Sequence, residues 1–234
     1  MADIGLLSTV MWTLMCGRFT LAERLERLRE RFGIIEVSFD YEPSYNIAPS
    51  QTITAVVHTS RGNIMIPVRW GFQLGDILAI NARDDKIIDV TTFRRAFEQS
   101  RCLIPASGFY EWQSVGRKKI PKYIRMKSQE PFAFAGLLQE WRTKEGTLDR
   151  RTTIITTSPN EVVAPIHDRM PVILPPEEEN NWLNPSTDLD LLATYLVPYQ
   201  ASEMDAYTVS ARVNSVSNND PSLTKPKKGL ESFL

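Results

Sequence analysis

Apolar residues recur at helical spacing in only a few segments of the chain. Leu21, Leu25 and Leu28 are separated by charged residues. This spacing predicts an amphipathic surface helix over 21–31 that ends near Gly33. Further helices are predicted at 91–100, 177–183 and 189–196. The acidic run 177–179 follows two prolines, which places its carboxylates in a first helical turn and predicts a capping role.

Strand patterns are more frequent than helical ones. Short β-branched or aromatic runs, separated by turn residues, predict strands at 52–59, 65–72, 101–106, 108–113, 122–127, 132–137, 151–157 and 170–174. Residues 41–51 favour an irregular loop, and 215–228 a loosely ordered C-terminal strap. Many strands interleaved with few helices predict an α+β fold, with a curved, barrel-like, mainly antiparallel sheet and flanking helices.

Composition indicates a globular chain with no bulk attraction to nucleic acid. Its 234 residues are 42% hydrophobic, and 27 basic against 28 acidic residues give a formal charge of −1. Any DNA contact must therefore come from locally clustered arginines. Two cysteines are too few for a disulfide framework, so we expect a reducing cytoplasm. No stretch reaches the roughly 18 to 20 apolar residues of a membrane-spanning helix, and no membrane partner is expected.

The first fifteen residues are apolar but do not resemble a standard export signal. No basic residue precedes the apolar run, which argues against secretion. A lipoprotein signal ending at Cys16 is disfavoured because Met15 is bulky at a position that usually holds a small residue. We treat residues 1–14 as an extension and 15–234 as one domain.

Four short blocks carry polar side chains that folding alone does not require. They are Cys16-Gly17-Arg18, Asn81-Ala82-Arg83, Gly108-Phe109-Tyr110-Glu111-Trp112 and His167-Asp168-Arg169-Met170-Pro171. A nucleophilic cysteine needs a base or a positive neighbour, and His167 is one of two histidines available. Burial of Glu111 in its apolar stretch would raise its pKa, which suits proton transfer near neutral pH.

Each of these residues also has an ordinary structural explanation. Cys16 could be a small buried hydrophobe, Glu111 an outward strand residue and His167 a hydrogen-bonded core histidine. The arginines could form surface ion pairs. Two Cys and two His without a pair at ligand spacing do not indicate a zinc site, and no cofactor is expected.

Taken together and in this order, the blocks resemble the SRAP family (SOS response-associated peptidase, or abasic-site processing proteins). The resemblance covers Met15 to the C-terminus. It is carried by MCGRFT (15–20), YNIAPSQ (45–51), RWGF (69–72), INAR (80–83), RCLIPASGFYEW (101–112), FAFAGL (132–137), TIITT (153–157), IHDRMPVIL (166–174) and VN (213–214). The chain departs from the family pattern in a short segment after WGF that lacks a tryptophan, and in Asp84-Asp85 after NAR.

The resemblance implies a substrate and a set of site residues. The substrate is single-stranded DNA that contains abasic sites, handled in the cytoplasm and on the nucleoid during DNA damage. Four residues match the family's catalytic positions: Cys16, Asn81, Glu111 and His167. Six match its DNA-binding positions: Arg18, Asn46, Pro49, Trp70, Arg83 and Arg169.

Chemistry explains why an N-terminal cysteine suits this substrate. An abasic sugar opens to an aldehyde, and an α-amine with a pKa of about 8 is appreciably neutral at physiological pH. After a Schiff base forms, the thiol of the same residue can close a thiazolidine ring. Cys16 must therefore become the N-terminal residue, and we expect either translation from Met15 or self-cleavage to expose it. The alternatives are a thiol peptidase that acts on other proteins, with His167 as base, and a non-catalytic module that binds single-stranded DNA.

Overall fold

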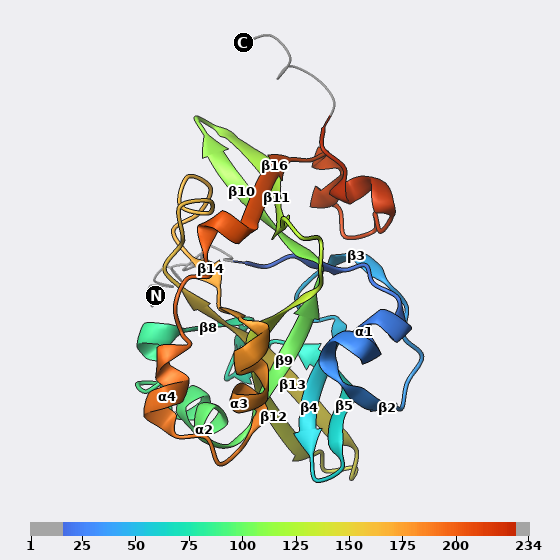
Figure 1. The fold of residues 1–234 in the computed structure, drawn as a ribbon, viewed down its shortest axis with the longest axis vertical. Helices are drawn as coiled ribbons and strands as arrows, with labels where there is room; N and C mark the ends of the chain where they lie inside the picture. The colour runs from blue at the N-terminus through green and yellow to red at the C-terminus, as the bar shows by residue number, and fades with distance from the viewer. Residues whose placement is uncertain (1–15, 228–234) are drawn as a thin grey trace, which may run out of the picture.

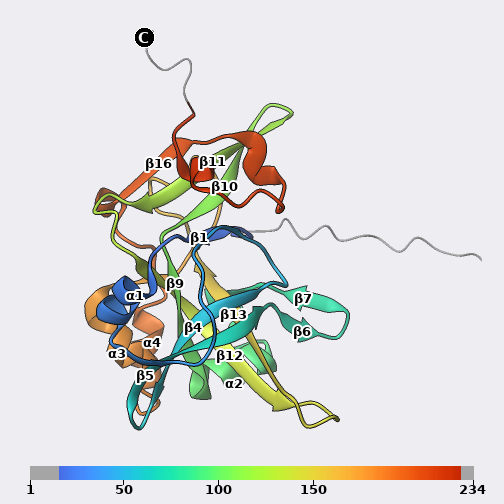
Figure 2. The same cartoon turned by 90° about the vertical axis from the view of Figure 1, so that its right-hand side faces the viewer.

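The computed structural model describes residues 16–227 (Figures 1 and 2). Its strands are β1 (Phe19–Leu21), β2 (Ile34–Val37), β3 (Ser44–Ile47), β4 (Thr52–Thr59), β5 (Gly62–Trp70), β6 (Phe72–Leu74), β7 (Ile77–Ala79), β8 (Asn81–Arg83), β9 (Arg101–Ala106), β10 (Gly108–Val115), β11 (Lys118–Met126), β12 (Phe132–Arg142), β13 (Leu148–Thr157), β14 (Met170–Pro171), β15 (Ile173–Leu174) and β16 (Met204–Thr208). Its α-helices are α1 (Leu25–Phe32), α2 (Thr91–Gln99), α3 (Glu179–Leu183) and α4 (Leu189–Thr194). Short 3-10 turns are η1 (Asp84–Lys86), η2 (Pro176–Glu178), η3 (Ala201–Glu203), η4 (Ala211–Asn214) and η5 (Pro221–Thr224).

Five strands close into a barrel in the order β13, β12, β9, β4, β5. The closure is a parallel pairing of β13 with β5, in which Arg151 lies opposite Arg69 and Thr152 opposite Trp70. The other four pairings are antiparallel. Strands β2, β8, β14 and β15 extend this sheet. The α+β fold with a curved, barrel-like, mainly antiparallel sheet and flanking helices is therefore confirmed (Figure 2).

A second, antiparallel sheet lies at one end of the barrel and carries the candidate chemistry. Its order is β16, β11, β10, β1, β3, and Figure 1 shows β10, β11 and β16 above the barrel strands. Only Ser107 separates β9 from β10, so the chain passes directly from the barrel into this sheet. The barrel thereby fixes the position of β10, and β10 in turn pairs with β1, where Phe19 lies opposite Phe109.

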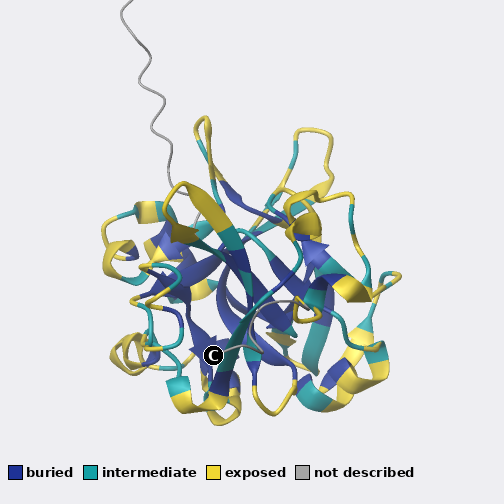
Figure 3. Ribbon diagram, turned by 90° about the horizontal axis from the view of Figure 1, so that it is seen from above, coloured by how far each residue is buried: buried dark blue, intermediate teal, exposed yellow. Residues whose placement is uncertain are grey.

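Aromatic side chains fill the space between the two sheets. The Phe19 ring lies 5.2 Å from the ring of Trp70 and 5.7 Å from that of Phe134, both in edge-on arrangements. Such pairs contribute beyond their buried area. Figure 3 shows the buried strands at the centre and the exposed loops around them. Cys16 precedes β1, and the chain is thus anchored in the core three residues further on, at Phe19.

Gly108 allows β10 to approach β11 closely. A Cβ at this position would lie 2.4 Å from the Tyr123 ring and 2.7 Å from the Ile124 carbonyl oxygen. The Tyr123 hydroxyl shares a 2.8 Å hydrogen bond with Thr20 Oγ1. Any larger residue at 108 would push apart strands that position Cys16 and Glu111.

The structure corrects the boundaries at the N-terminal end. The first helix begins at Leu25 rather than Leu21, because Leu21 belongs to β1 and pairs with β3. Its end is as predicted: Gly33 adopts φ +60°, and its amide donates to the Arg29 carbonyl. The segment 41–51 is not wholly irregular, since β3 pairs with β1.

The C-terminal strap is ordered where it is described, up to residue 227. Asn46 Nδ2 donates to the carbonyls of Ser215 at 2.9 Å and Asn218 at 2.7 Å. Leu223 is fully buried. The prediction of a loosely ordered segment is therefore wrong for 215–227, because a buried amide and an apolar anchor hold it.

The acidic run does more than cap a helix. Glu177 and Glu178 lie in the turn η2. Glu179, however, is 5% exposed, and its two oxygens accept from Arg31 at 2.8 Å each. This bidentate pair joins α1 to α3.

Candidate functional site

Cys16 lies in a buried position at the start of the second sheet. Its backbone has φ +44°, and the residue is 3% exposed. The backbone nitrogen of Cys16 donates to Oε1 of Glu111 at 2.5 Å. Burial, followed by the negative charge of Glu111, raises the pKa of the Cys16 thiol well above its usual value. The thiol is therefore held protonated next to a carboxylate.

Glu111 is buried although the strand pattern allows it to face outward. It is 2% exposed, so the explanation of Glu111 as a solvated strand residue is wrong. Tyr110 packs into a separate cluster with Tyr123 and Val209, and alternation along β10 directs Glu111 to the opposite side, toward Cys16. Burial raises the pKa of the Glu111 carboxyl, and hydrogen bonds from Cys16 and the charge of His167 oppose that rise.

His167 lies on the loop between β13 and β14, near enough to Glu111 for its charge to lower the pKa of that carboxyl. Its Nδ1 is 3.2 Å from the Arg169 amide nitrogen and 2.9 Å from Asp168 Oδ1. The amide contact requires Nδ1 without a proton, whereas the carboxylate contact requires a protonated Nδ1. Nδ1 can therefore accept from the Arg169 amide or donate to Asp168, depending on which ring nitrogen carries a proton.

Arg169 combines deep burial with an incomplete set of hydrogen bonds. It is 9% exposed, and its Nη2 donates to Asp84 Oδ1 at 2.5 Å and to the Thr156 carbonyl. Its positive charge lowers the pKa of the Cys16 thiol, although burial outweighs this effect. Its Nε is buried and has no hydrogen-bond partner among the described residues.

Arg18 and Asn81 share this incomplete satisfaction. Arg18 donates from Nη1 to Asn46 Oδ1 and to the Val213 carbonyl, both at 2.7 Å, and stacks on Trp112 at 5.7 Å. Within residues 16–227, neither Arg18 Nε nor Asn81 Nδ2 has a partner, although both atoms are buried. Buried donors without partners are costly. Together with Arg169 Nε, they are donors that a ligand with oxygen acceptors could use.

Arg83 and Pro49 lie at the surface. Arg83 follows Asn81 by two residues on β8, so both side chains share one side of that strand. Arg83 is exposed and pairs with Asp85 at 2.8 Å. Pro49 is half-buried in the turn between β3 and β4. Both side chains keep exposed surface, although Asp85 engages one edge of the Arg83 guanidinium.

Two predicted DNA contacts are wrong. Trp70 has no exposed surface, and its indole N–H donates to the Ile80 carbonyl at 2.9 Å, so Trp70 is a core residue. Asn46 is 2% exposed, and both ends of its amide are occupied by Arg18 and by the C-terminal strap. Asn46 can orient Arg18 but cannot itself contact DNA in this structure.

Sequence reasoning missed the residues that hold the site in place. Asp84 anchors Arg169. Asn160 fixes the loop before His167: its Oδ1 accepts from the Val162 and Val163 amides at 3.1 and 3.0 Å. The Ser-Pro-Asn sequence before that loop is a turn signal that could have identified Asn160.

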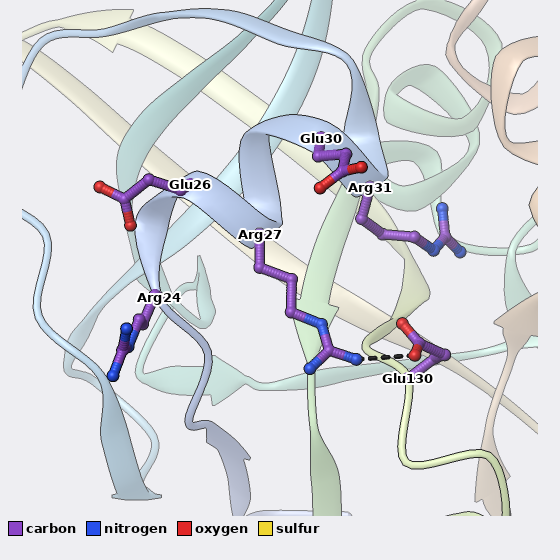
Figure 4. A pocket seen from close by; sticks show the side chains of 6 residues that line it. All are labelled: Arg24, Glu26, Arg27, Glu30, Arg31 and Glu130. Carbon is purple, nitrogen blue, oxygen red and sulfur yellow. Dashed lines mark hydrogen bonds and ion pairs between the residues drawn. The ribbon is translucent and has the colours of Figure 1, made fainter.

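One surface hollow is lined mainly by residues of α1, and not by Cys16. It measures about 800 Å³ and is lined by Arg24, Glu26, Arg27, Glu30, Arg31 and Glu130 (Figure 4). Arg27 crosses it to pair with Glu130 at 2.7 Å. Its charges balance, and no predicted site residue lines it. We place the candidate site at Cys16 because burial, unpartnered donors and a perturbed acid coincide there.

Two further negative findings concern the described part of the chain. No cluster of three or more His, Cys, Asp or Glu side chains there could hold a metal ion. Among the helices of residues 16–227, none has the length and apolar character needed to cross a membrane.

Comparison with known proteins places these residues in a family. The model of the family "SOS response associated peptidase (SRAP)" matches residues 15–216. The chain belongs to the SRAP family. One SRAP relative, the abasic site processing protein YoqW of Bacillus subtilis (strain 168), is 45% identical over 221 residues, which cover 89% of this chain and 98% of YoqW.

More distant SRAP relatives share the whole length as well. The abasic site processing protein YedK of Escherichia coli (strain K12) is 27% identical over 236 residues, covering 91% of this chain and all of YedK. A crystal structure of a protein from Bacteroides thetaiotaomicron matches with a TM-score of 0.80 at 26% identity, over 91% of this chain and 100% of that one. The SRAP fold is thus shared over nearly the full chain.

Proposed function

We propose that this protein recognises abasic sites in single-stranded DNA and bonds to them covalently through Cys16, once Cys16 is the N-terminal residue. The observation that carries the proposal is the 2.5 Å hydrogen bond from the Cys16 nitrogen to Glu111 in a buried site. The curated relatives named above are abasic site processing proteins, which supports the substrate.

Glu111 is suited to move protons at both reacting atoms of Cys16. In our proposal it accepts a proton from the α-ammonium, and the neutral amine attacks the C1 aldehyde of the opened sugar. Loss of one water gives the imine. The thiol then adds across the C=N bond: sulfur bonds to C1, and its proton passes to nitrogen through Glu111. Only one water leaves overall, and the raised pKa of the thiol keeps its proton in place until this step.

Arg18, Asn81 and Arg169 would bind the DNA around the reacting sugar. Their unpartnered donors match phosphate and sugar oxygens, which carry no base identity. Arg83 adds a donor at the rim. We therefore expect weak sequence preference, because these groups contact the backbone.

Release of residues 1–15 is part of the proposal, although those residues lie outside the described part of the chain. With Met15 attached, the Cys16 nitrogen is an amide and not a nucleophile. In our proposal Glu111, which accepts the N–H of this nitrogen, protonates it once it becomes tetrahedral, as the Met15–Cys16 bond breaks and water adds to the Met15 carbonyl. Self-cleavage would thus use the same acid.

A thiol peptidase that acts on other proteins is less well supported. Such enzymes need a thiolate, and their cysteines lie in electropositive surroundings that lower the pKa. Burial and Glu111 raise the pKa of the Cys16 thiol instead.

The test is adduct formation with an oligonucleotide that carries one abasic site. Chains translated from Met1 and from Met15 are incubated with it, denatured and weighed intact by mass spectrometry. We expect a stable adduct, smaller by one water than its two components, only from chains that begin at Cys16. Cys16→Ala retains the amine but cannot close the ring, so its adduct should not persist. A durable adduct from a chain that still carries residues 1–15 would contradict the mechanism.

A further inference from the structure

The turn that follows β8 places two aspartates against two arginines of the candidate site. Arg83 donates from Nε to Asp85 Oδ1 at 2.9 Å and from Nη2 to Asp85 Oδ2 at 2.8 Å. Arg169 donates from Nη2 to Asp84 Oδ1 at 2.5 Å. Both carboxylates belong to the turn η1, so one short segment engages both guanidinium groups.

The two ion pairs differ in how firmly they are held. Asp84 also accepts from the Thr157 hydroxyl at 2.8 Å and from the Asp85 amide at 2.8 Å, which makes it part of the packed structure. The Asp85 carboxylate has no partner in the described chain except Arg83. Its side chain is 49% exposed, and that of Arg83 is 44% exposed. The exposed pair between Arg83 and Asp85 can therefore open without disturbing the fold.

Asp85 occupies the edge of Arg83 that a phosphate would use. A guanidinium binds carboxylate and phosphate with the same two-pronged geometry, through parallel N–H donors. Because Nε and Nη2 of Arg83 are both engaged by Asp85, a DNA phosphate can use this edge of the guanidinium only by displacing the carboxylate, which leaves it the weaker approach through Nη1 beside a carboxylate of like charge.

The charges around Arg83 also weaken its attraction for DNA. The hydrogen bond to Asp85 and the negative charges of Asp85, Asp84 and Asp168 raise the pKa of the Arg83 guanidinium. With Arg83, Arg169 and Lys86 counted as +3, and these three carboxylates together with Asp89 as −4, the rim carries a net charge of −1. It therefore provides no local excess of positive charge to attract DNA before contact.

We propose that Asp85 competes with DNA phosphate for Arg83 and so limits the non-covalent affinity of the protein for single-stranded DNA. The inference rests on the proposed function, since it takes Arg83 as a phosphate contact. A protein that bonds covalently to the abasic sugar does not need tight binding to intact strands. Asp85 would leave retention on DNA to the covalent step.

The expected effect is modest because the pair is exposed. Exposed ion pairs contribute at most about 1 kcal/mol, which corresponds to about a fivefold change in affinity. We expect Asp85→Asn to bind an undamaged single-stranded oligonucleotide about two- to fivefold more tightly than the unchanged protein. The adduct rate at saturating abasic DNA should stay the same.

A neighbouring residue provides the matched control. Asp89 lies four residues further on, is 61% exposed and pairs with Lys86 at 2.8 Å. Asp89→Asn, like Asp85→Asn, removes one negative charge from this segment, but it leaves the ion pair between Arg83 and Asp85 intact. The four chains to compare are Asp85→Asn, Asp89→Asn, Arg83→Ala and the double variant Arg83→Ala/Asp85→Asn, in the form of the chain that gives the adduct.

Fluorescence anisotropy with a labelled undamaged oligonucleotide at one fixed salt concentration measures the affinities. The inference predicts tighter binding for Asp85→Asn than for Asp89→Asn, and no gain when Arg83 is already alanine. Equal affinities for the two Asn variants, a gain that persists without Arg83, or weaker binding by Asp85→Asn would each overturn it. If the unchanged protein forms no adduct with abasic DNA and no variant binds DNA, the proposed function itself fails. If the adduct forms but the two Asn variants agree, only the role of Asp85 fails.

Discussion

Arg101 and Arg169 are both buried, at 7% and 9% exposure, yet their surroundings differ. Arg101 donates from Nε to the Trp182 carbonyl at 2.8 Å, from Nη1 to the Phe97 carbonyl at 2.5 Å, and from Nη2 to the Asn184 carbonyl at 2.8 Å. Every nitrogen of its guanidinium is satisfied by the protein. Arg169 is satisfied only at Nη2, and its Nε is left buried without a partner within the described chain.

On the proposed function, the difference separates a structural cation from one that keeps a donor for DNA. The carbonyls around Arg101 belong to the C-terminal ends of α2 and α3, where the helix dipoles favour positive charge. Burial lowers the pKa of Arg101, and no carboxylate compensates it. Arg169 lies instead beside Cys16, in a site with further unpartnered donors. Completeness of hydrogen bonding, rather than burial, distinguishes the two regions.

The largest expected effect is on the reactive side of this comparison. Glu111→Gln preserves shape but removes the proton acceptor next to Cys16. Loss of a positioned acid–base group slows a reaction by roughly 10²- to 10⁴-fold. We therefore expect adduct formation to slow by that order. Affinity for undamaged single-stranded DNA should stay within about twofold, because glutamine keeps the shape of glutamate. Gel-based adduct kinetics and anisotropy measure the two quantities.

The control for Glu111→Gln is Gln113→Glu, which adds a carboxylate on the same side of β10, two residues further on. In the double variant Glu111→Gln/Gln113→Glu, the added carboxylate should leave the slow rate unrestored, because the Gln113 side chain bonds to the Pro165 carbonyl and not to Cys16. A Glu111→Gln variant that reacts at the unchanged rate would exclude Glu111 from proton transfer.

On the structural side, Arg101→Met should cost stability and leave the chemistry intact. The substitution leaves the carbonyls at the ends of α2 and α3 without their donors, and unsatisfied buried groups cost about 1 to 3 kcal/mol each. Relaxation and entry of water reduce the sum, so we expect about 2 to 4 kcal/mol less stability, in the range of severe core substitutions. Urea unfolding measures the loss. The folded fraction should form the adduct at the unchanged rate, and a slower rate would link Arg101 to the site.

The sequence pattern predicts the framework of the molecule well. The strands at 52–59 and 101–106 coincide with β4 and β9, because their apolar residues are buried in the barrel. Periodicity cannot show that β13 pairs with β5 and closes the barrel, since that pairing joins residues about 80 positions apart in the chain. Helical spacing assigns Leu21 to the first helix. Its pairing with β3, which the spacing does not reveal, places it in β1.

The candidate site depends more on the resemblance than on local pattern. Alternation makes Glu111 look exposed; its burial follows from the packing of β10 between two apolar clusters. Trp70 was assigned to the DNA face by its position in a motif, whereas its indole is held by the Ile80 carbonyl inside the fold. Asp84 and Asp85 acquire their roles only once the turn η1 brings them to the arginines, which sequence spacing does not indicate.

A smaller effect should distinguish the Nη2 donor of Arg169, which Asp84 engages, from its unpartnered Nε donor. Arg169→Lys keeps the positive charge opposite Asp84 but removes the unpartnered Nε. If that donor binds DNA oxygen, one charge-assisted hydrogen bond is lost, worth about 1.5 kcal/mol, or roughly tenfold in affinity. Anisotropy with abasic and with undamaged oligonucleotides should show the same loss. Arg101→Lys, the same substitution at the other buried arginine, should lower stability without changing affinity. An unchanged affinity for Arg169→Lys would show that the Nε donor has no ligand in the complex.

The smallest expected effect is the pH dependence of stability that Glu111 contributes. Its pKa is raised by burial from the ordinary value of 4.5, so the folded chain holds this proton more tightly than the unfolded chain does. As pH rises through the window between 4.5 and the raised value, the unfolded chain loses the proton first, and the folded state loses relative stability. Glu111→Gln cannot ionise and escapes this loss.

The melting temperature of Glu111→Gln relative to the unchanged protein should therefore increase from pH 4 toward neutral pH. The increase should be smaller than the effect of Arg101→Met, because Cys16 and His167 partly offset the effect of burial on the pKa of Glu111. Glu145→Gln is the control, since the pKa of that exposed carboxyl is lowered by Thr143 and the sign is opposite. A difference that stays flat across this range would mean that the ionised Glu111 is as well accommodated in the fold as in water, and that the site does not hold a proton in reserve.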